Sequence, residues 1–146
     1  MVETKKATIV IADDDDDDFL IIKEAYEEAD LTSNIVRVSD GEDLMNYLLC
    51  RDKYKNQTLQ HPILILLDLN MPKKDGREVL KEIRLHKELY KIPIIVLTTS
   101  NLEKDINESY SLGVHSFIRK PVNYSDFVEV FRTFKKYWLE IVQLPS

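Results

Sequence analysis

The sequence predicts an α/β fold with a doubly wound parallel sheet. Apolar runs alternate with stretches of helical periodicity, which is typical of parallel strands joined by helical crossovers. Four of these runs are short and bounded by polar residues, as in strands that are buried on both faces. They span residues 9–12, 63–67, 94–97 and 116–119. We therefore expect five strands and five helices, with no internal repeat and no linker.

Residues 7–12 are expected to form the first strand, and a helix from about 16 to 29 follows it. The apolar residues that recur at helical spacing in this helix are Phe19, Ile22, Ala25, Tyr26 and Ala29. A second strand is expected near 34–39, where branched apolar residues cluster. These elements form the first strand–helix–strand unit of the sheet.

A turn leads from the second strand into the second helix, which Ser39 or Asp40 can cap. The residues that this helix carries inward are Leu44, Tyr47 and Leu48. After the helix, residues 51–61 are polar and irregular, which indicates a loop before the third strand.

The second half of the chain continues the alternation. A helix is expected at roughly 76–87, and the next strand ends at Thr98. A short helix near 103–112 ends at Gly113, a residue type that is common just after helices. A last strand then precedes a long helix from about 123 to 142.

Length, charge and cysteine content disfavour several classes of protein. The chain has 146 residues, which suits one domain, and a net charge of −6, which disfavours generic nucleic-acid binding. No apolar run is long enough to cross a bilayer, and the residues after Met1 lack the apolar region of a secretory signal. The single cysteine, Cys50, cannot form an internal disulfide, which fits a reducing compartment. We therefore expect a cytoplasmic protein that does not bind membranes.

Acidic side chains follow two of the strands, at the edge where open parallel sheets bind ligands. Asp13 and Asp14 follow the first strand, and Asp68 follows the third. Neighbouring carboxylates raise one another's pKa, and a hard cation such as Mg²⁺ relieves this repulsion through oxygen ligands. The apolar strand ends at Ala12, which places the acidic pair at Asp13 and Asp14; a shift by one residue within the aspartate run is the alternative.

Two further strands bring a hydroxyl and an ammonium group to the same edge. Thr98 can donate to a phosphoryl oxygen, and Lys120 can neutralise its charge. Asp68 can act as a nucleophile, because carboxylates form acyl phosphates. Each residue alone has a simpler interpretation, and residues 15–17 are typical helix caps. Together, at the ends of separate strands, these residues favour a phosphoryl-transfer site.

The arrangement resembles the receiver domains of two-component response regulators over nearly the whole chain. The matching residues are the pair Asp13-Asp14, the motif Leu67-Asp68-Leu69-Asn70-Met71-Pro72 with Lys73-Lys74-Asp75-Gly76, the hydroxyl residue Thr98 and the pair Lys120-Pro121. The resemblance implies a flavodoxin-like sheet in the order 2-1-3-4-5. It also implies one receiver domain over residues 1–146, with a C-terminal helix and tail at about 123–146 and no output domain.

By this resemblance, Asp68 accepts a phosphoryl group from a histidine kinase. Mg²⁺ is the expected cofactor, bound directly by Asp14, Asp68 and the backbone carbonyl of Asn70, while Asp13 acts mainly through metal-bound water. Lys120 pairs with the carboxylate and then with the phosphoryl group. The protein is then not an enzyme acting on other substrates, because it catalyses only its own phosphorylation and dephosphorylation.

The resemblance also implies a conformational switch. Thr98 and Phe117 are the expected switch pair: the hydroxyl moves toward the phosphoryl oxygens and the aromatic ring turns inward. In the family, the peptide bond between Lys120 and Pro121 is cis, which this sequence permits.

Within the family, the chain resembles the small stand-alone regulators that partner bacterial and cyanobacterial phytochrome kinases. The residues that carry this similarity are the phospho-acceptor motif continued through Arg77-Glu78-Val79-Leu80, Val96-Leu97-Thr98-Thr99-Ser100, and the ending Tyr137-Trp138-Leu139-Glu140-Ile141-Val142. The similarity implies a phytochrome-type sensor kinase as partner and pairing of two copies through the C-terminal end.

The final helix has a wider apolar surface than a core-facing stripe needs. One face is formed by Phe127, Phe131, Phe134, Trp138 and Ile141. Val130, Tyr137 and Leu144 flank it at seven-residue spacing, and with Trp138 they are the expected homodimer interface. The alternative is that Trp138 and the tail only cover the sheet.

Two other functions stay open at this point. A phosphohydrolase with an aspartyl-phosphate usually needs a second acid–base aspartate just after the nucleophile, where this chain has Asn70, and a cap over its substrate. A receiver-like scaffold would bind partners without phosphate. The intact set of Asp68, Thr98 and Lys120 argues against the scaffold.

Overall fold

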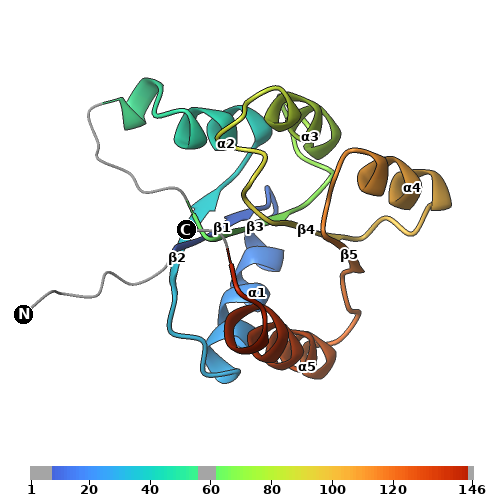
Figure 1. The fold of residues 1–146 in the computed structure, drawn as a ribbon. Coiled ribbons are helices and arrows are strands. Elements are labelled where there is room, and N and C mark those ends of the chain that lie inside the picture. Colours follow the sequence, from blue (N-terminus) through green and yellow to red (C-terminus); the bar gives the residue numbers. More distant parts are fainter. Residues whose placement is uncertain (1–7, 56–61, 145–146) are drawn as a thin grey trace, which may run out of the picture.

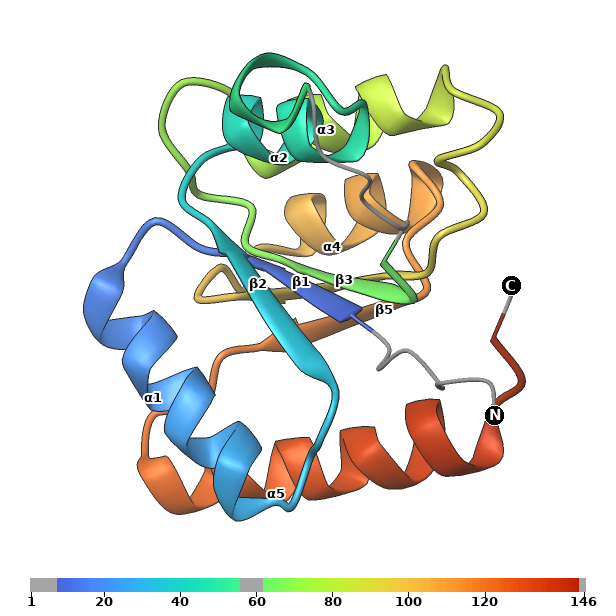
Figure 2. The ribbon, with the colours of Figure 1, turned by 90° about the vertical axis from the view of Figure 1, so that its left-hand side faces the viewer.

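The computed structural model describes residues 8–55 and 62–144, which form a three-layer α/β sandwich (Figure 1). The strands are β1 (Thr8–Ala12), β2 (Asn34–Val38), β3 (Leu64–Leu67), β4 (Ile94–Thr98) and β5 (Ser116–Arg119). The α-helices are α1 (Asp16–Glu28), α2 (Gly41–Leu48), α3 (Gly76–Arg84), α4 (Glu103–Ser111) and α5 (Tyr124–Phe134). Helices α2, α3 and α4 cover one face of the sheet, and α1 and α5 cover the other, as Figures 1 and 2 show.

The sheet is parallel throughout and has the order β2-β1-β3-β4-β5, which confirms the predicted topology. At the carboxyl ends, Ala12 pairs with Leu67, and Thr98 pairs with Arg119. The residues that follow β1, β3, β4 and β5 therefore reach the same edge of the sheet. This register brings polar side chains from four separate segments together.

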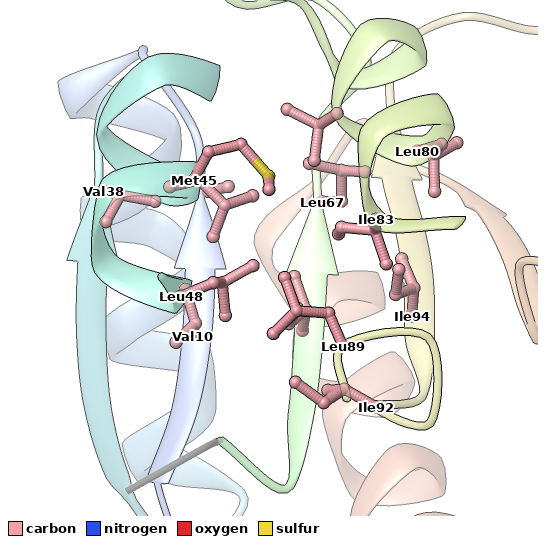
Figure 3. Close-up of a cluster of buried hydrophobic side chains, with 14 of the residues drawn as sticks. Val10, Val38, Met45, Leu48, Leu67, Leu80, Ile83, Leu89, Ile92 and Ile94 are labelled. Carbon is pink, nitrogen blue, oxygen red and sulfur yellow. The ribbon is translucent and has the colours of Figure 1, made fainter. Parts of the chain in front are cut away.

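The central strands are buried on both faces, which explains why their sequences are continuous apolar runs. Alternate residues point to opposite sides, so that Val10 and Ile65 join the core under α2 and α3 while Ile9 and Leu64 join the core under α1 and α5. Figure 3 shows the first of these cores. Two cores of this kind hold the sheet rigid and fix the positions of its strand ends.

The final helix spans nearly the predicted range, Tyr124 to Ile141, but it changes type partway along. The α-helical part ends at Phe134, and residues Lys135–Ile141 form a π-helical segment, where Val142 N–H donates to the Tyr137 carbonyl at 2.8 Å. An i→i+5 bond adds a residue to the turn, so side chains at spacings of three and four no longer return to one side. As a result Phe134 is buried, whereas Ile141, which was predicted to share its face, is exposed.

The remaining boundaries differ little from the predicted ones. Helix α3 ends at Arg84 rather than near 87, and the predicted loop contains a single 3₁₀ turn at Asp52–Tyr54. Three parts of these predictions lie outside the described residues: the loop at 56–61, residue 7 of the first strand and the start of the chain. Over the described ranges, no helix is both long enough and apolar enough to cross a membrane.

Candidate functional site

The Asp68 carboxylate is held in one position by backbone and side-chain contacts. Its backbone N–H donates to the Ala12 carbonyl at 2.9 Å, and its Oδ1 accepts from the Asn70 N–H at 3.0 Å and from the Thr98 hydroxyl at 2.8 Å. Gly76, at the start of α3, packs directly against the Asp68 backbone, because a Cβ there would lie 2.7 Å from the Asp68 carbonyl oxygen. A side chain at position 76 would therefore displace the loop that carries Asp68.

Three carboxylates meet at the end of β1 and β3. Asp13, Asp14 and Asp68 each place an oxygen within 4.8 Å of the others. Asp13 and Asp68 are buried and Asp14 is exposed, so the cluster opens to solvent on one side. Burial raises the pKa of Asp13, although a hydrogen bond from Lys120 opposes this. Three hard oxygen donors with an open side fit Mg²⁺ or Mn²⁺.

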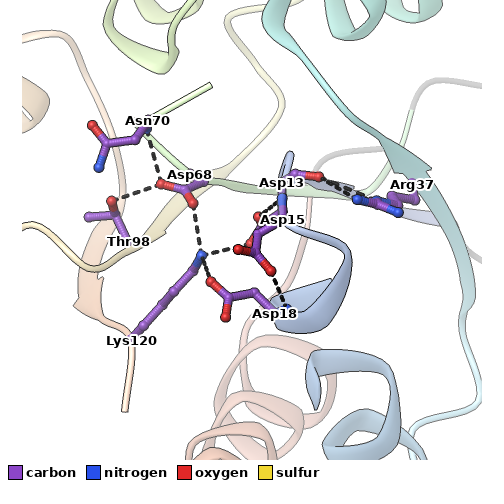
Figure 4. Close-up of polar contacts among 8 residues, drawn as sticks. All are labelled: Asp13, Asp15, Asp18, Arg37, Asp68, Asn70, Thr98 and Lys120. Carbon is purple, nitrogen blue, oxygen red and sulfur yellow. Dashed lines mark hydrogen bonds and ion pairs between the residues drawn. The ribbon is translucent and has the colours of Figure 1, made fainter. Parts of the chain in front are cut away.

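Lys120 lies at the centre of the polar cluster (Figure 4). Its ammonium donates to Asp13 Oδ2, Asp18 Oδ2 and Asp68 Oδ2, each at 2.8 Å. Burial alone would lower the pKa of Lys120, but the three carboxylate hydrogen bonds together raise it above its ordinary value. Lys120 is therefore positively charged at every physiological pH and offsets part of the negative charge around it.

The aspartates that follow β1 have different contacts. Asp15 caps α1 by accepting from the Asp18 N–H at 2.9 Å, as predicted. Asp16 and Asp17, which were also predicted as caps, lie in the first turn of α1 instead, and Asp16 pairs with Arg37 at 2.7 Å. Arg37 also donates to the Asp13 carbonyl and lies over the Phe19 ring, 4.8 Å from its centre. This arginine of β2 therefore ties the acidic loop to the neighbouring strand.

Asp18 and Arg37 are functional-site residues that the sequence patterns do not predict. Asp18 is the third residue of α1 after the cap Asp15, and the spacing of a cap and an acidic residue three positions later resembles a capping box. That spacing marks the start of the helix and places Asp18 in its first turn, but the contact of Asp18 with Lys120, 102 residues later, leaves no local signal. No comparable signal marks Arg37, because its partners come from another strand.

The structure also describes the predicted switch residues. Thr98 is buried at the end of β4, and Phe117 on β5 is half-buried against the core under α2 and α3.

The peptide bond between Lys120 and Pro121 is trans, and the described residues include no cis peptide bond, so the expected cis bond is wrong for this structure. Trans is the preferred state of this bond, and Lys120 reaches all three carboxylates with it.

Three of the four predicted interface residues, Val130, Tyr137 and Trp138, line an open apolar groove beside β5. The groove is lined by Ile118, Glu129, Val130, Thr133, Phe134, Tyr137 and Trp138. Tyr137 is about half exposed, and Trp138 is half-buried with its ring edge-on to His115. Leu144 lies apart from this groove, in a second hollow at the other side of Trp138.

Comparison with known proteins places this geometry in a family. The family model of the response regulator receiver domain matches residues 9–132. Response regulator Rcp1 of Synechocystis sp. is 39% identical over 126 residues, which cover 86% of this chain and 84% of Rcp1.

Two crystal structures are similar over nearly the whole chain. The phosphorylated cyanobacterial phytochrome response regulator RcpA is 40% identical with a TM-score of 0.89, and the match covers 97% of this chain and all of RcpA. The Mn²⁺-bound form of Rcp1 is 37% identical with a TM-score of 0.87, over 96% of this chain and 99% of Rcp1.

Proposed function

Because the chain belongs to the response regulator receiver family, we propose that Asp68 is its phospho-acceptor and receives a phosphoryl group from a histidine kinase. One observation carries the proposal: a buried carboxylate is contacted at 2.8 Å by both a hydroxyl and an ammonium group and lies beside two further carboxylates. Receiver domains are signalling proteins, and this arrangement supports a switch rather than an enzyme with a separate substrate.

The chemistry follows from the positions of the donors. An oxygen of Asp68 attacks the phosphorus of a phosphohistidine, a P–O bond forms, and the P–N bond breaks. The electron pair of that bond goes to the imidazole, which takes a proton from solvent. Lys120 and Thr98, which hydrogen-bond Asp68 before transfer, then donate to phosphoryl oxygens.

Asp13, Asp14 and Asp68, with the backbone carbonyl of Asn70, are the residues we assign to Mg²⁺. The ion supplies positive charge to the phosphoryl oxygens as negative charge accumulates on them. The single charge of Lys120 is shared by Asp13, Asp18 and Asp68, and Asp14 adds a fourth carboxylate. A divalent ion would offset the negative charge that remains.

Intact-protein mass spectrometry tests the assignment of Asp68. After incubation with Mg²⁺ and a small acyl phosphate, the protein should gain one phosphoryl group, and the Asp68→Asn variant should gain none. No adduct in the wild-type protein, together with no binding of beryllofluoride, would contradict the assignment and favour a scaffold that acts without phosphate. Steady release of phosphate from many organic monoesters would instead indicate a phosphohydrolase.

The kinase partner is proposed to be a phytochrome-type sensor, because the chain matches RcpA and Rcp1 over nearly its full length. A purified phytochrome histidine kinase should transfer its phosphoryl group to this protein faster than an unrelated histidine kinase does, and the transfer should be lost in Asp68→Asn. Equal rates from both kinases would leave Asp68 as the acceptor and remove the phytochrome assignment.

We also propose a homodimer that covers the groove beside β5. The groove is apolar, and Tyr137 at its rim is 52% exposed, so a second copy would remove apolar surface from water. Sedimentation at increasing concentration should show a dimer that Tyr137→Ser weakens. Tyr90→Ser is the matched control, because Tyr90 is 54% exposed between α3 and β4 and does not line the groove. A monomer at every concentration, with and without phosphorylation, would contradict the proposal.

A further inference from the structure

Asp14 is the least constrained of the three carboxylates that we assign to Mg²⁺. The carboxylates of Asp13 and Asp68 are buried, and each accepts from the Lys120 ammonium at 2.8 Å. The Asp14 carboxylate is exposed, and it has no hydrogen bond or ion pair among the described residues. Its place in the cluster therefore depends on the backbone that carries it.

Strand β2 holds this backbone through two contacts with Asp13. The Asp13 N–H donates to the Val38 carbonyl at 3.1 Å, which continues the pairing of β1 with β2. The Asp13 carbonyl accepts from Arg37 Nε at 3.3 Å and from Arg37 Nη2 at 3.2 Å (Figure 4). Because the peptide group is planar, the position of this carbonyl oxygen fixes the direction in which the chain continues to Asp14.

The Arg37 guanidinium is itself held by α1. Its Nη1 pairs with Asp16 at 2.7 Å, and its plane lies over the Phe19 ring, 4.8 Å from the ring centre. A guanidinium is planar and carries five N–H donors, so it can contact a carbonyl, a carboxylate and a ring together. Arg37 is thus fixed between β2 and α1, on either side of the segment that carries Asp14.

The charge of Arg37 and its position have opposite effects on a bound cation. Its positive charge contacts the backbone of the cation cluster, and like charges repel. If charge were the main effect of Arg37, its removal would strengthen Mg²⁺ binding. If position were the main effect, its removal would weaken Mg²⁺ binding.

We propose that Arg37 is a positioning residue of the Mg²⁺ site. It holds the Asp13 carbonyl so that the Asp14 carboxylate stays within reach of Asp68, as the cluster requires. This role depends on the proposed assignment of Asp13, Asp14 and Asp68 to the ion. Arg37 does not contact the ion and acts through Asp14.

The Mg²⁺ affinity of the unphosphorylated protein, measured by isothermal titration calorimetry, tests the sign. Arg37→Gln should raise the dissociation constant about threefold to tenfold, because the Asp13 carbonyl loses its charged donor. Arg37→Lys keeps the charge but lacks the planar pair of donors, and it should raise the constant by less.

Arg119→Gln is the matched control for charge. Arg119 ends β5 at the same edge of the sheet, is exposed, and has no hydrogen bond or ion pair among the described side chains. Its replacement should change the Mg²⁺ dissociation constant less than about twofold, and toward tighter binding.

A double variant tests whether Arg37 acts through Asp14. Asp14→Asn should itself weaken Mg²⁺ binding, and the addition of Arg37→Gln should weaken it little further, because both changes remove the same ligand. The number of waters on bound Mn²⁺, measured by water-proton relaxation, should rise in Arg37→Gln as water replaces the carboxylate. A loss of stability alone would leave this number unchanged.

Three results would overturn the role of Arg37. Tighter Mg²⁺ binding in Arg37→Gln would assign it a purely electrostatic effect, unchanged binding would limit it to structural support, and additive effects with Asp14→Asn would mean that it does not act through Asp14. Failure of the proposed ion assignment looks different, because Asp14→Asn would then bind Mg²⁺ as tightly as the wild-type protein does.

Discussion

Helices α5 and α4 are attached to the same sheet by different kinds of contact. The buried side chains of α5 are Phe127, Val128, Phe131 and Phe134. The buried side chains of α4 are Asp105 and Ser109, both polar. Asn123 caps α5 by accepting from the Asp126 N–H, while no side chain caps α4. Helix α5 is therefore fixed by apolar packing, and α4 depends on polar contacts.

The polar attachment of α4 centres on Asp105. Arg77 of α3 donates to its Oδ1, with Nη2 at 2.7 Å and Nε at 3.1 Å, and the Ser100 hydroxyl donates to its Oδ2 at 2.5 Å. Ser100 lies two residues after Thr98, so this network joins the phosphoryl-transfer edge to α4. A hydrogen bond depends on direction, and its donor or acceptor can change to another polar group or to water. A buried apolar side chain has no comparable alternative partner in water. We therefore expect α4, rather than α5, to move when the site changes.

Truncation of the α5 core should have the largest effect. Phe131 is 1% exposed and contacts the rings of Tyr26 and Phe134 edge-on. Phe131→Ala should lower the free energy of unfolding by about 3–5 kcal/mol, because it removes buried apolar area and leaves a cavity. Urea denaturation measures this. Arg132→Ala on the exposed side of the same helix should cost less than about 1 kcal/mol, and an equal loss would mean that α5 is not held by its apolar face.

Breaking the α4 attachment should cost less and act locally. Asp105→Asn should lower the free energy of unfolding by about 1–3 kcal/mol, since it removes the charge that Arg77 and Ser100 contact. Amide hydrogen exchange should speed up in α4 while α5 stays protected. The control Glu103→Gln removes a charge from the same helical turn at an exposed position. Uniformly faster exchange in both helices would contradict independent attachment.

The strands and the polar residues at their ends were predictable because both depend on local sequence, whereas the strand order came from the family resemblance. Continuous apolar runs that stop at Asp13, Asp68 and Thr98 mark buried strands and the edge where they end. The buried role of Asp105 was not predictable, because a charged residue in a polar helix is ordinarily on the surface and its partner Arg77 is 28 residues away. Position-specific polar contacts between helices leave no periodic pattern in the sequence.

The α4 attachment should also depend on pH. The hydrogen bond from Ser100, and then that from Arg77, lower the pKa of Asp105 below the ordinary value of 3.8. Because the folded pKa is the lower one, the carboxylate stabilises the fold fully above about pH 4, and this contribution is lost as the pH falls through the folded pKa. The stability difference between wild-type and Asp105→Asn should be constant from pH 7 to pH 5 and shrink below pH 4. A difference that persists unchanged at pH 3 would show that the amide disrupts packing instead.

The smallest effect is expected at the second buried residue of α4. The Ser109 hydroxyl is buried and has no hydrogen-bond partner among the described residues. Desolvation of such a group is uncompensated, so Ser109→Ala should leave the free energy of unfolding unchanged or raise it by up to about 1 kcal/mol. Asp105 and Ser109 are both buried on the same helix, yet their substitutions should change stability differently. A loss above 1 kcal/mol in Ser109→Ala, measured by urea denaturation, would mean that this hydroxyl holds α4 as Asp105 does, and α4 would then have two polar anchors instead of one.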